Sequence, residues 1–308
     1  AATRDKARMR AQLAAAGLPQ PRFRSVGPDD DVARAVAEVG LPAVVKPVSL
    51  AASRGVVRVD DAGEAPAVAA RIRAIVADAG EDARAPLLVE GYVDGTEVAV
   101  EGLLRGGDLE VLALFDKPDP LTGPYFEETI YVTPSRLAAA SQHAVAGAIS
   151  AATAALGLRE GPVHAEARLP GGEVVVLEVA ARSIGGLCSR ALRFGAGISL
   201  EELILRHALG VPVDTRREAA ASGVMMLPIP AAGRLEQVTG QDQARAVPGI
   251  AGLEITVPRG RWVRPLPEGD RYLGFLFGRG GSPAEVEAAL RAAHACLTVV
   301  LGEVGLGA

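Results

Sequence analysis

The sequence predicts an α+β fold, and three observations support this class. Short apolar runs that favour strands alternate with segments of helical periodicity over the first two thirds of the chain. Consecutive strands are joined by hairpin-type turns, such as the one at 105–108, which favours antiparallel pairing. After about Val211 the predicted elements become shorter and turn residues more frequent, which indicates a small second α+β unit. A chain of 308 residues is long enough for both parts.

In the first part of the chain, helix stop signals and apolar runs define the elements in order. A helix over Asp5–Ala16 ends at Gly17 and is followed by Pro19, which is a common stop signal. The predicted elements that follow are helices at 32–39 and 65–79, strands at 41–47, 56–59, 86–90, 97–104 and 109–115, a small-residue loop at 49–55 and a connection at 91–95.

The later elements begin with a long segment at 118–134 that is rich in proline, glycine and aspartate. We predict a loop there, of the length that often carries function. A capping box at Ser199 opens a helix that ends near Leu209. The remaining predicted elements are a helix at 136–156, a hairpin at 163–182, strands at 223–229, 252–257 and 272–277, and a final helix from 282 to about 301.

The composition argues against several classes of function. A net charge of −5 argues against a nucleic-acid partner held by bulk electrostatics. Hydrophobic residues make up 49% of the chain, but many are alanines and no run resembles a membrane span. Cys188 and Cys296 lie far apart without a nearby partner motif, which argues against a disulfide framework or a structural zinc site. This cysteine usage fits a reducing cytoplasm.

Two glutamates on the predicted hairpin are the most informative pair in the chain. If a three-residue loop at 171–173 joins the strands, Glu166 lies opposite Glu178 and both side chains point to one face. A two-residue loop would instead place Glu166 opposite Leu177. Opposed carboxylates repel unless a cation lies between them, and Mg²⁺ is a hard cation that prefers such oxygens. A solvated acidic face is the competing interpretation.

Strand alternation places further charged side chains on the face of these glutamates. His164 and Arg168 share the face of Glu166, and Arg182 shares that of Glu178. If the glutamates hold a cation, one face of the hairpin carries a site for a metal ion and an anion; the hairpin alone equally fits a solvated acidic face.

A lysine at the end of a strand forms the next candidate motif. Lys46 closes the buried strand at 41–47 and precedes the small-residue loop at 49–55. Loops of this kind let backbone N–H groups approach phosphates, and the lysine adds a point charge. By itself the motif equally fits a simple β-hairpin with a solvated lysine.

The segment at 89–97 reads as a strand, a hinge and a second strand. Glu90 is placed to accept a hydrogen bond from an adenine amino group, and the backbone of Val93 to contact the ring edge. Glu97 is placed to accept hydrogen bonds from ribose hydroxyls. The competing interpretation is an acidic surface turn.

Taken in order, these motifs resemble the ATP-grasp superfamily, and in particular its carboxylate–amine ligases, which include L-amino-acid ligases and carnosine-synthase-like enzymes. The resemblance covers Asp5 to about Gly210 and rests on the order and spacing of the whole set. The motifs of this set are Asp5-Lys6, Lys46-Pro47 with the loop to Gly55, the segment 90–97, the long loop, and the runs 164–168 and 177–186.

The resemblance implies an ATP-grasp fold, in which two α+β subdomains clasp the nucleotide. The ATP-grasp domain would span 1–210, with a lid subdomain at about 22–92, and the C-terminal α+β subdomain would span 211–308. The family normally has an α/β domain ahead of the Asp5-Lys6 helix. Because the chain starts at Ala1 without an initiator methionine and runs directly into this helix, we expect that the N-terminal domain is missing from the sequence. The sequence shows no signal peptide.

The resemblance also implies roles at the nucleotide site. Lys6 and Lys46 would contact the phosphates of ATP, and the 49–55 loop, with Ser53 and Gly55, would close over them. Glu90 and Val93 would hold the adenine and Glu97 the ribose.

At the reaction centre, Glu166 and Glu178 would hold magnesium, with manganese as an alternative, bridging the ATP phosphates. Arg182 would face the acyl phosphate and the substrate carboxylate. Glu128, in the long loop, would recognise a substrate amine.

The activity implied is ATP-dependent ligation, in which a carboxylate, an amino acid above all, becomes an acyl phosphate and reacts with an amine. The partners would be small-molecule carboxylates and amines, and a homodimer is compatible with the sequence. Two alternatives stay open: another ATP-grasp ligase of the carboxylase or purine-pathway type, and a non-catalytic ATP-binding module of a larger protein. Ala180 stands where many family members have a metal-binding asparagine, which counts against the carboxylase type.

Overall fold

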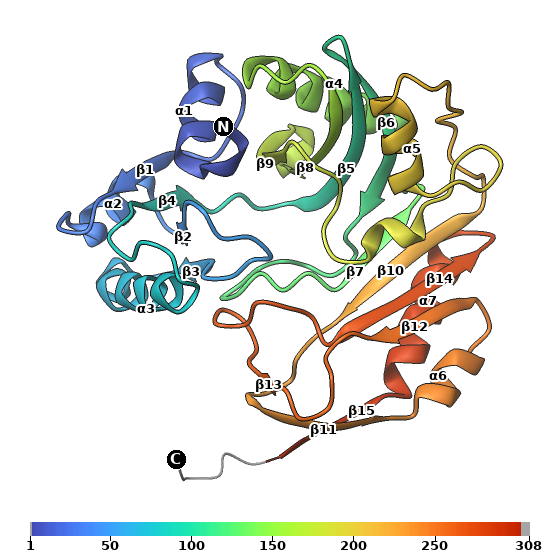
Figure 1. Ribbon diagram of the computed structural model, residues 1–308. Helices are drawn as coiled ribbons and strands as arrows, with labels where there is room; N and C mark the ends of the chain where they lie inside the picture. Colours follow the sequence, from blue (N-terminus) through green and yellow to red (C-terminus); the bar gives the residue numbers. More distant parts are fainter. Residues whose placement is uncertain (1, 303–308) are drawn as a thin grey trace.

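The computed structural model describes residues 2–302 (Figure 1). The chain enters through a short 3₁₀ turn, η1 (Ala2–Arg4), and the helix α1 (Lys6–Ala15). Asp5 caps α1, since its carboxylate accepts hydrogen bonds from the N–H groups of Ala7 and Arg8. This cap fixes the position of Lys6 at the first turn of the helix.

The first unit is a four-stranded antiparallel sheet with two helices, seen in blue to teal at the left of Figure 1. The strand order is β1-β4-β2-β3. Valines of the sheet and apolar side chains of the two helices, such as Val36 and Ile72, form its core. Its elements are β1 (Phe23–Val26), α2 (Val32–Val39), β2 (Ala43–Pro47), β3 (Val57–Val59), η2 (Ala62–Glu64), α3 (Ala65–Asp78) and β4 (Leu87–Gly91).

An antiparallel sheet of eight strands forms the centre of the molecule, in the order β12-β14-β10-β7-β6-β5-β8-β9. The strands are β5 (Thr96–Arg105), β6 (Asp108–Asp116), β7 (Ile130–Thr133), β8 (Gly161–Leu169), β9 (Val175–Ala180), β10 (Ala221–Leu227), β12 (Ile250–Ile255) and β14 (Gly274–Gly280).

Both faces of this central sheet are covered, which explains the long apolar run of β5. Val98 and Val100 pack toward Ile149 of α4 (Ala139–Ala155) in one core. Ala99 and its neighbours pack instead with Leu203 of α5 (Leu200–Ala208) in a second core. A strand buried on both faces reads as continuous apolar sequence rather than as alternation.

The last third of the chain adds three strands to the central sheet and a small sheet of its own. The small sheet has the order β13-β11-β15. Because β10, β12 and β14 belong to the central sheet, that sheet crosses the predicted boundary at 210, and the boundary itself stays a prediction. The other elements are the 3₁₀ turns η3 (Pro170–Gly172) and η4 (Cys188–Ala191), β11 (Gly233–Thr239), α6 (Gln241–Ala246), β13 (Trp262–Val263), α7 (Pro283–Ala295) and β15 (Thr298–Gly302).

Several element predictions are wrong in detail. The predicted loop at 118–134 ends in β7, a β-branched and aromatic run that pairs with β10 and β6. The final helix stops at Ala295, and the β-branched residues after it form β15, which pairs with β11. Four further elements, β1, β11, β13 and α6, are not predicted by the local sequence pattern. These elements are short, and tertiary pairing rather than local propensity defines them.

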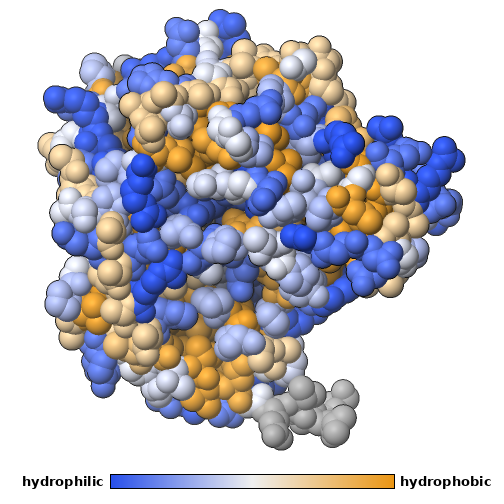
Figure 2. Space-filling view, turned by 180° about the vertical axis from the view of Figure 1, so that it is seen from behind, coloured by the Kyte–Doolittle hydropathy of each residue, from blue (hydrophilic) through white to orange (hydrophobic). Residues whose placement is uncertain are grey.

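In the part of the chain that the structure describes, no helix is long and apolar enough to cross a membrane. On the face seen in Figure 2, hydrophobic residues occur in several separate areas among hydrophilic ones.

Candidate functional site

The two hairpin glutamates lie directly opposite each other. Glu166 of β8 pairs with Glu178 of β9, which confirms the predicted register at this point. Toward the turn the pairing shifts by one residue, so that Ala167 faces Val176 and Leu177 is the extra residue. Both registers considered from the sequence therefore occur in one hairpin, and the bulge between them keeps the carboxylates opposed.

A cavity of about 430 Å³ lies at this hairpin, which is within the usual range for a small-molecule site. It brings together residues from α1, the first sheet, the long loop and the hairpin, far apart in sequence. The predicted site residues that line it are Lys6, Lys46, Ser53, Glu90, Val93, Glu97, Glu128, Glu166, Glu178 and Arg182. Gly55 is outside the lining: its N–H donates to the carbonyl of Pro267, and its φ of 71° favours glycine.

One side of the cavity carries a buried cluster of two cations and one carboxylate. Lys46 Nζ lies 2.7 Å from Glu90 Oε2, and Arg10 Nε donates to Glu90 Oε1 at 2.5 Å. Burial alone would raise the pKa of Glu90, but the two cations outweigh it and lower this pKa to about 2. Both carboxylate oxygens of Glu90 are thus engaged, and its predicted contact with adenine stays a prediction.

The low pKa of Glu90 predicts acid sensitivity. Because the folded-state pKa lies below the ordinary value of 4.5, the ionised carboxylate stabilises the fold above pH 4.5, and this stabilisation is lost as the pH falls toward 2. Glu90→Gln is expected to remove this portion of the pH dependence in urea unfolding experiments between pH 5 and 2. The exposed Glu173→Gln should keep it. An unchanged slope in Glu90→Gln would contradict the assigned pairing.

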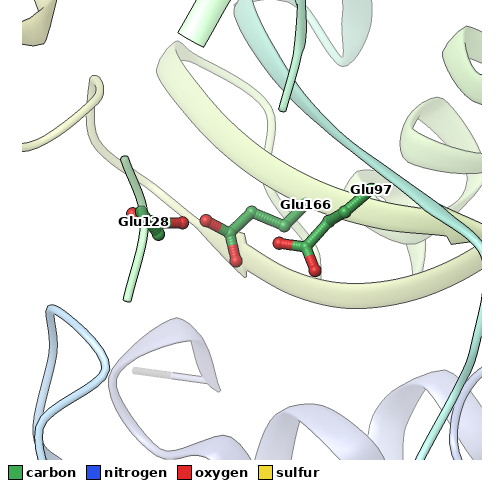
Figure 3. Close-up of side chains that lie close together, drawn as sticks. All are labelled: Glu97, Glu128 and Glu166. Atoms are coloured by element: carbon green, nitrogen blue, oxygen red, sulfur yellow. The ribbon is translucent and has the colours of Figure 1, made fainter. Parts of the chain in front are cut away.

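A second cluster joins three carboxylates around one ammonium group. Figure 3 shows the side chains of Glu97, Glu128 and Glu166 converging on a common space. Lys117 Nζ lies at 2.6 Å from Glu97, 2.5 Å from Glu128 and 3.1 Å from Glu166. Arg168 Nε also donates to Glu97 at 2.7 Å, so this carboxylate is held by two cations and its predicted ribose contact stays a prediction.

The electrostatics of this cluster separate its glutamates. Burial and the nearby Glu166 raise the pKa of Glu128 to about 7, although Lys117 and the Tyr131 hydroxyl oppose the rise. Burial also acts to raise the pKa of Glu166, but Lys117 and His164 hold it well below its usual range. The surroundings therefore favour the ionised form of Glu166 and the protonated form of Glu128.

His164 lies beside Glu166 on the same strand, β8. Its Nδ1 lies 2.5 Å from Glu101 Oε1 and its Nε2 3.5 Å from Glu166 Oε1. Burial alone would lower the pKa of His164, but the two carboxylates raise it to about 10. The imidazolium is thus a buried, positively charged neighbour of Glu166.

Sequence reasoning missed Lys117 and Arg10. The chain contains only three lysines against a large number of arginines. Two of them line the cavity, and the third, Lys117, touches three of its glutamates. In an arginine-rich chain, the rare lysines are themselves a signal for a site. Arg10 lies on a helix without any motif, and no local signal points to it.

The residues present fit a magnesium-bound nucleoside triphosphate. Glu166 and Glu178 are opposed oxygen donors, and Lys6 Nζ lies 3.7 Å from Glu178 Oε2. In the described part of the chain, Arg182 forms no ion pair with an acidic side chain, although it lines the cavity. A guanidinium that lines a cavity without an acidic partner suits an anionic ligand.

Comparison with known proteins relates two parts of the chain to described protein domains. A model of the ATP-grasp domain matches residues 39–191, and a model of the L-amino acid ligase C-terminal domain 2 matches residues 225–302. The chain resembles an L-amino acid ligase from Bacillus licheniformis with a TM-score of 0.82 and 28% identity, covering 98% of this chain and 74% of that structure.

Two further proteins show the breadth of the similarity. Alanine–anticapsin ligase from Bacillus subtilis is 28% identical over 219 residues, which cover 66% of this chain and 46% of that protein. An N5-carboxyaminoimidazole ribonucleotide synthetase from Thermotoga maritima shares the fold with a TM-score of 0.71 at 18% identity, covering 97% of this chain and 73% of that structure. The chain spans about half the length of the first curated relatives that it matches.

Proposed function

The chain belongs to the ATP-grasp superfamily, and on that premise we propose that it is a ligase that activates an amino-acid carboxylate with ATP and joins it to an amine. The observation that carries this proposal is the opposition of Glu166 and Glu178 in one cavity with Lys6, Lys46 and Arg182. These groups supply both metal-binding oxygens and phosphate-binding cations.

The chemistry has two steps. An oxygen of the substrate carboxylate attacks the γ-phosphorus of ATP, the bond to the bridging oxygen breaks, and ADP leaves with that electron pair. The amine nitrogen then attacks the acyl carbon, the bond to the phosphate oxygen breaks, and inorganic phosphate leaves while the nitrogen loses a proton. Phosphoryl transfer asks the protein mainly for positioning and neutralisation of charge.

The residues of the cavity match these demands. Lys6 and Lys46 are placed to neutralise the phosphates, and Arg182 to offset negative charge on the acyl oxygen. Glu166 and Glu178 would hold magnesium, which when bound neutralises the phosphate oxygens and fixes their position. Glu128, with its pKa near 7, is placed to hold the substrate amine and to take its proton.

Arg182 provides a direct test of the phosphate-transfer role. Arg182→Ala is expected to lower kcat for phosphate release by about 10²-fold, the usual loss when one donor to a developing negative charge is removed. Its side chain is exposed to the cavity, so stability should change little. Arg34→Ala, on the exposed face of α2, is the matched control. A kcat within threefold of wild type would contradict the role.

One alternative rests on a specific observation. The chain spans about half the length of the curated relatives, so a nucleotide-binding module that acts only within a larger assembly is the second candidate. A carboxylase or purine-pathway ligase is less well supported, because the similarity to such structures is at 18% identity and the second domain model is that of L-amino acid ligases.

A phosphate-release assay with Mg·ATP and pooled amino acids separates these candidates. The proposed ligase predicts release that depends on the amino-acid pool, together with a condensation product detected by mass spectrometry. Binding of ATP without turnover on any pool would favour the module and contradict the ligase. Release that depends on bicarbonate instead would favour the carboxylase type.

A further inference from the structure

One part of the cavity is apolar, unlike the part with the charged residues proposed to bind the nucleotide. Ile184, Cys188 and Met226 line it, and all three belong to the apolar core on the α5 side of the central sheet. Cys188 Sγ lies 3.4 Å from Met226 Sδ, so the two side chains form a continuous apolar wall. Tyr272, from the segment before β14, lines the same cavity and packs against this core.

The hydroxyl of Tyr272 stands out in this apolar surrounding. Among residues 2–302, its Oη is the one buried side-chain oxygen or nitrogen without a hydrogen-bond partner. Leaving a buried hydroxyl unpaired is costly, and native structures rarely do so without a reason. Burial raises the pKa of Tyr272 well above its usual value, so the group keeps its proton and can donate. A ligand atom that accepts a hydrogen bond from this hydroxyl would satisfy it.

The charged groups of the cavity indicate which part of an amino acid would contact the Tyr272 hydroxyl. An amino acid carries a carboxylate and an amine, and the charged partners for these are Arg182 and Glu128. The uncharged Tyr272 hydroxyl on an apolar wall is left for the side chain. A purely hydrocarbon side chain would leave the hydroxyl unpaired, whereas a side chain with one uncharged oxygen would pair with it.

We propose that Tyr272 is a specificity-determining residue, whose hydroxyl donates a hydrogen bond to a hydroxyl or amide oxygen on the side chain of an amino-acid substrate. The inference rests on the proposed ligase function and names its substrate class: small amino acids with an uncharged polar side chain. The apolar wall formed by Cys188 and Met226 contacts the hydrocarbon part of the same side chain.

The test uses isosteric pairs of labelled amino acids, threonine with valine and asparagine with leucine. Equilibrium dialysis of the full chain with magnesium and a non-hydrolysable ATP analogue measures the ratio of dissociation constants within each pair. Wild type is expected to bind the polar member of at least one pair about tenfold more tightly. Tyr272→Phe, which removes one oxygen, should bring the ratio within about twofold of unity.

Tyr125→Phe is the matched control, because Tyr125 is a tyrosine outside the cavity lining whose hydroxyl pairs with Arg71. It should keep the wild-type ratio. Equal binding of both members by wild type, a preference for the apolar members, or a preference that survives in Tyr272→Phe would each overturn the inference. So would failure of the wild type to bind any of the four amino acids. The wild-type comparison decides even if the variant does not fold.

Phosphate release, measured in parallel with ATP and the same amino acids, separates this inference from the proposed function. Release without a side-chain preference would leave the ligase proposal standing and remove the role of Tyr272. A preference in binding that Tyr272→Phe abolishes, without release on any pool, would support the pocket and contradict the ligase.

Discussion

Replacing Glu178 with alanine is expected to lower the rate of amino-acid-dependent phosphate release by about 10³-fold or more, because a metal ligand at the transferred phosphate contributes several kcal/mol to the transition state. Glu178 is opposed to Glu166 across the hairpin and lies beside Lys6. Without it, magnesium would keep one of its two predicted carboxylates. The loss should appear mainly in kcat.

The control for this prediction lies on the same hairpin. Glu173 is exposed at the turn, outside the cavity lining, and Glu173→Ala should retain wild-type turnover. The fold should tolerate Glu178→Ala, since removing the carboxylate relieves its repulsion with Glu166. Amino-acid-dependent release that persists at the wild-type rate in Glu178→Ala would exclude the metal role of this residue.

Replacing Arg10 with methionine is expected to lower the free energy of unfolding by about 3–5 kcal/mol, the usual loss when one partner of a buried ion pair is removed. The Arg10 side chain is fully buried and donates to Glu90 of β4. It also donates to the carbonyls of Val176 and Leu177 in β9. One guanidinium thus joins α1, the first sheet and the hairpin of β8 and β9.

Arg8→Met is the control for Arg10→Met, because Arg8 is exposed on the same helix. It should change the stability by less than about 0.5 kcal/mol. Urea unfolding at pH 7 measures both variants. A loss of unfolding free energy below 1 kcal/mol for Arg10→Met would mean that Lys46 alone satisfies Glu90. Arg10 would then not be needed to hold these elements together.

Local sequence could predict the parts of the site that depend on strand alternation. Opposed glutamates follow from a hairpin register, and a lysine at the end of an apolar strand follows from the strand itself. The bulge at Leu177 could not be predicted, because the turn conformation and the pairing of β8 with β5 fix it together. The same holds for β15, which forms only because β11 offers it an edge.

The partners of the predicted residues were beyond local reasoning. Glu90 meets Arg10 across 80 positions of sequence, and Glu97 meets Lys117 and Arg168 through the folding of three strands. From the sequence alone, we expect the carboxylates of Glu90 and Glu97 to be free to contact a nucleotide. In the structure, both carboxylates are instead paired with cationic side chains. Contacts of this kind arise from tertiary packing, which no local pattern encodes.

A crystal structure of the chain grown with Mn²⁺ and ATP or a non-hydrolysable analogue would show directly whether Glu166 and Glu178 hold the metal. Anomalous scattering identifies the position of manganese directly. We expect a metal ion within about 2.5 Å of carboxylate oxygens of both Glu166 and Glu178, in contact with the phosphates. A metal held by Glu97 and Glu128 instead, or a nucleotide bound away from Lys46 and Arg182, would contradict this expectation.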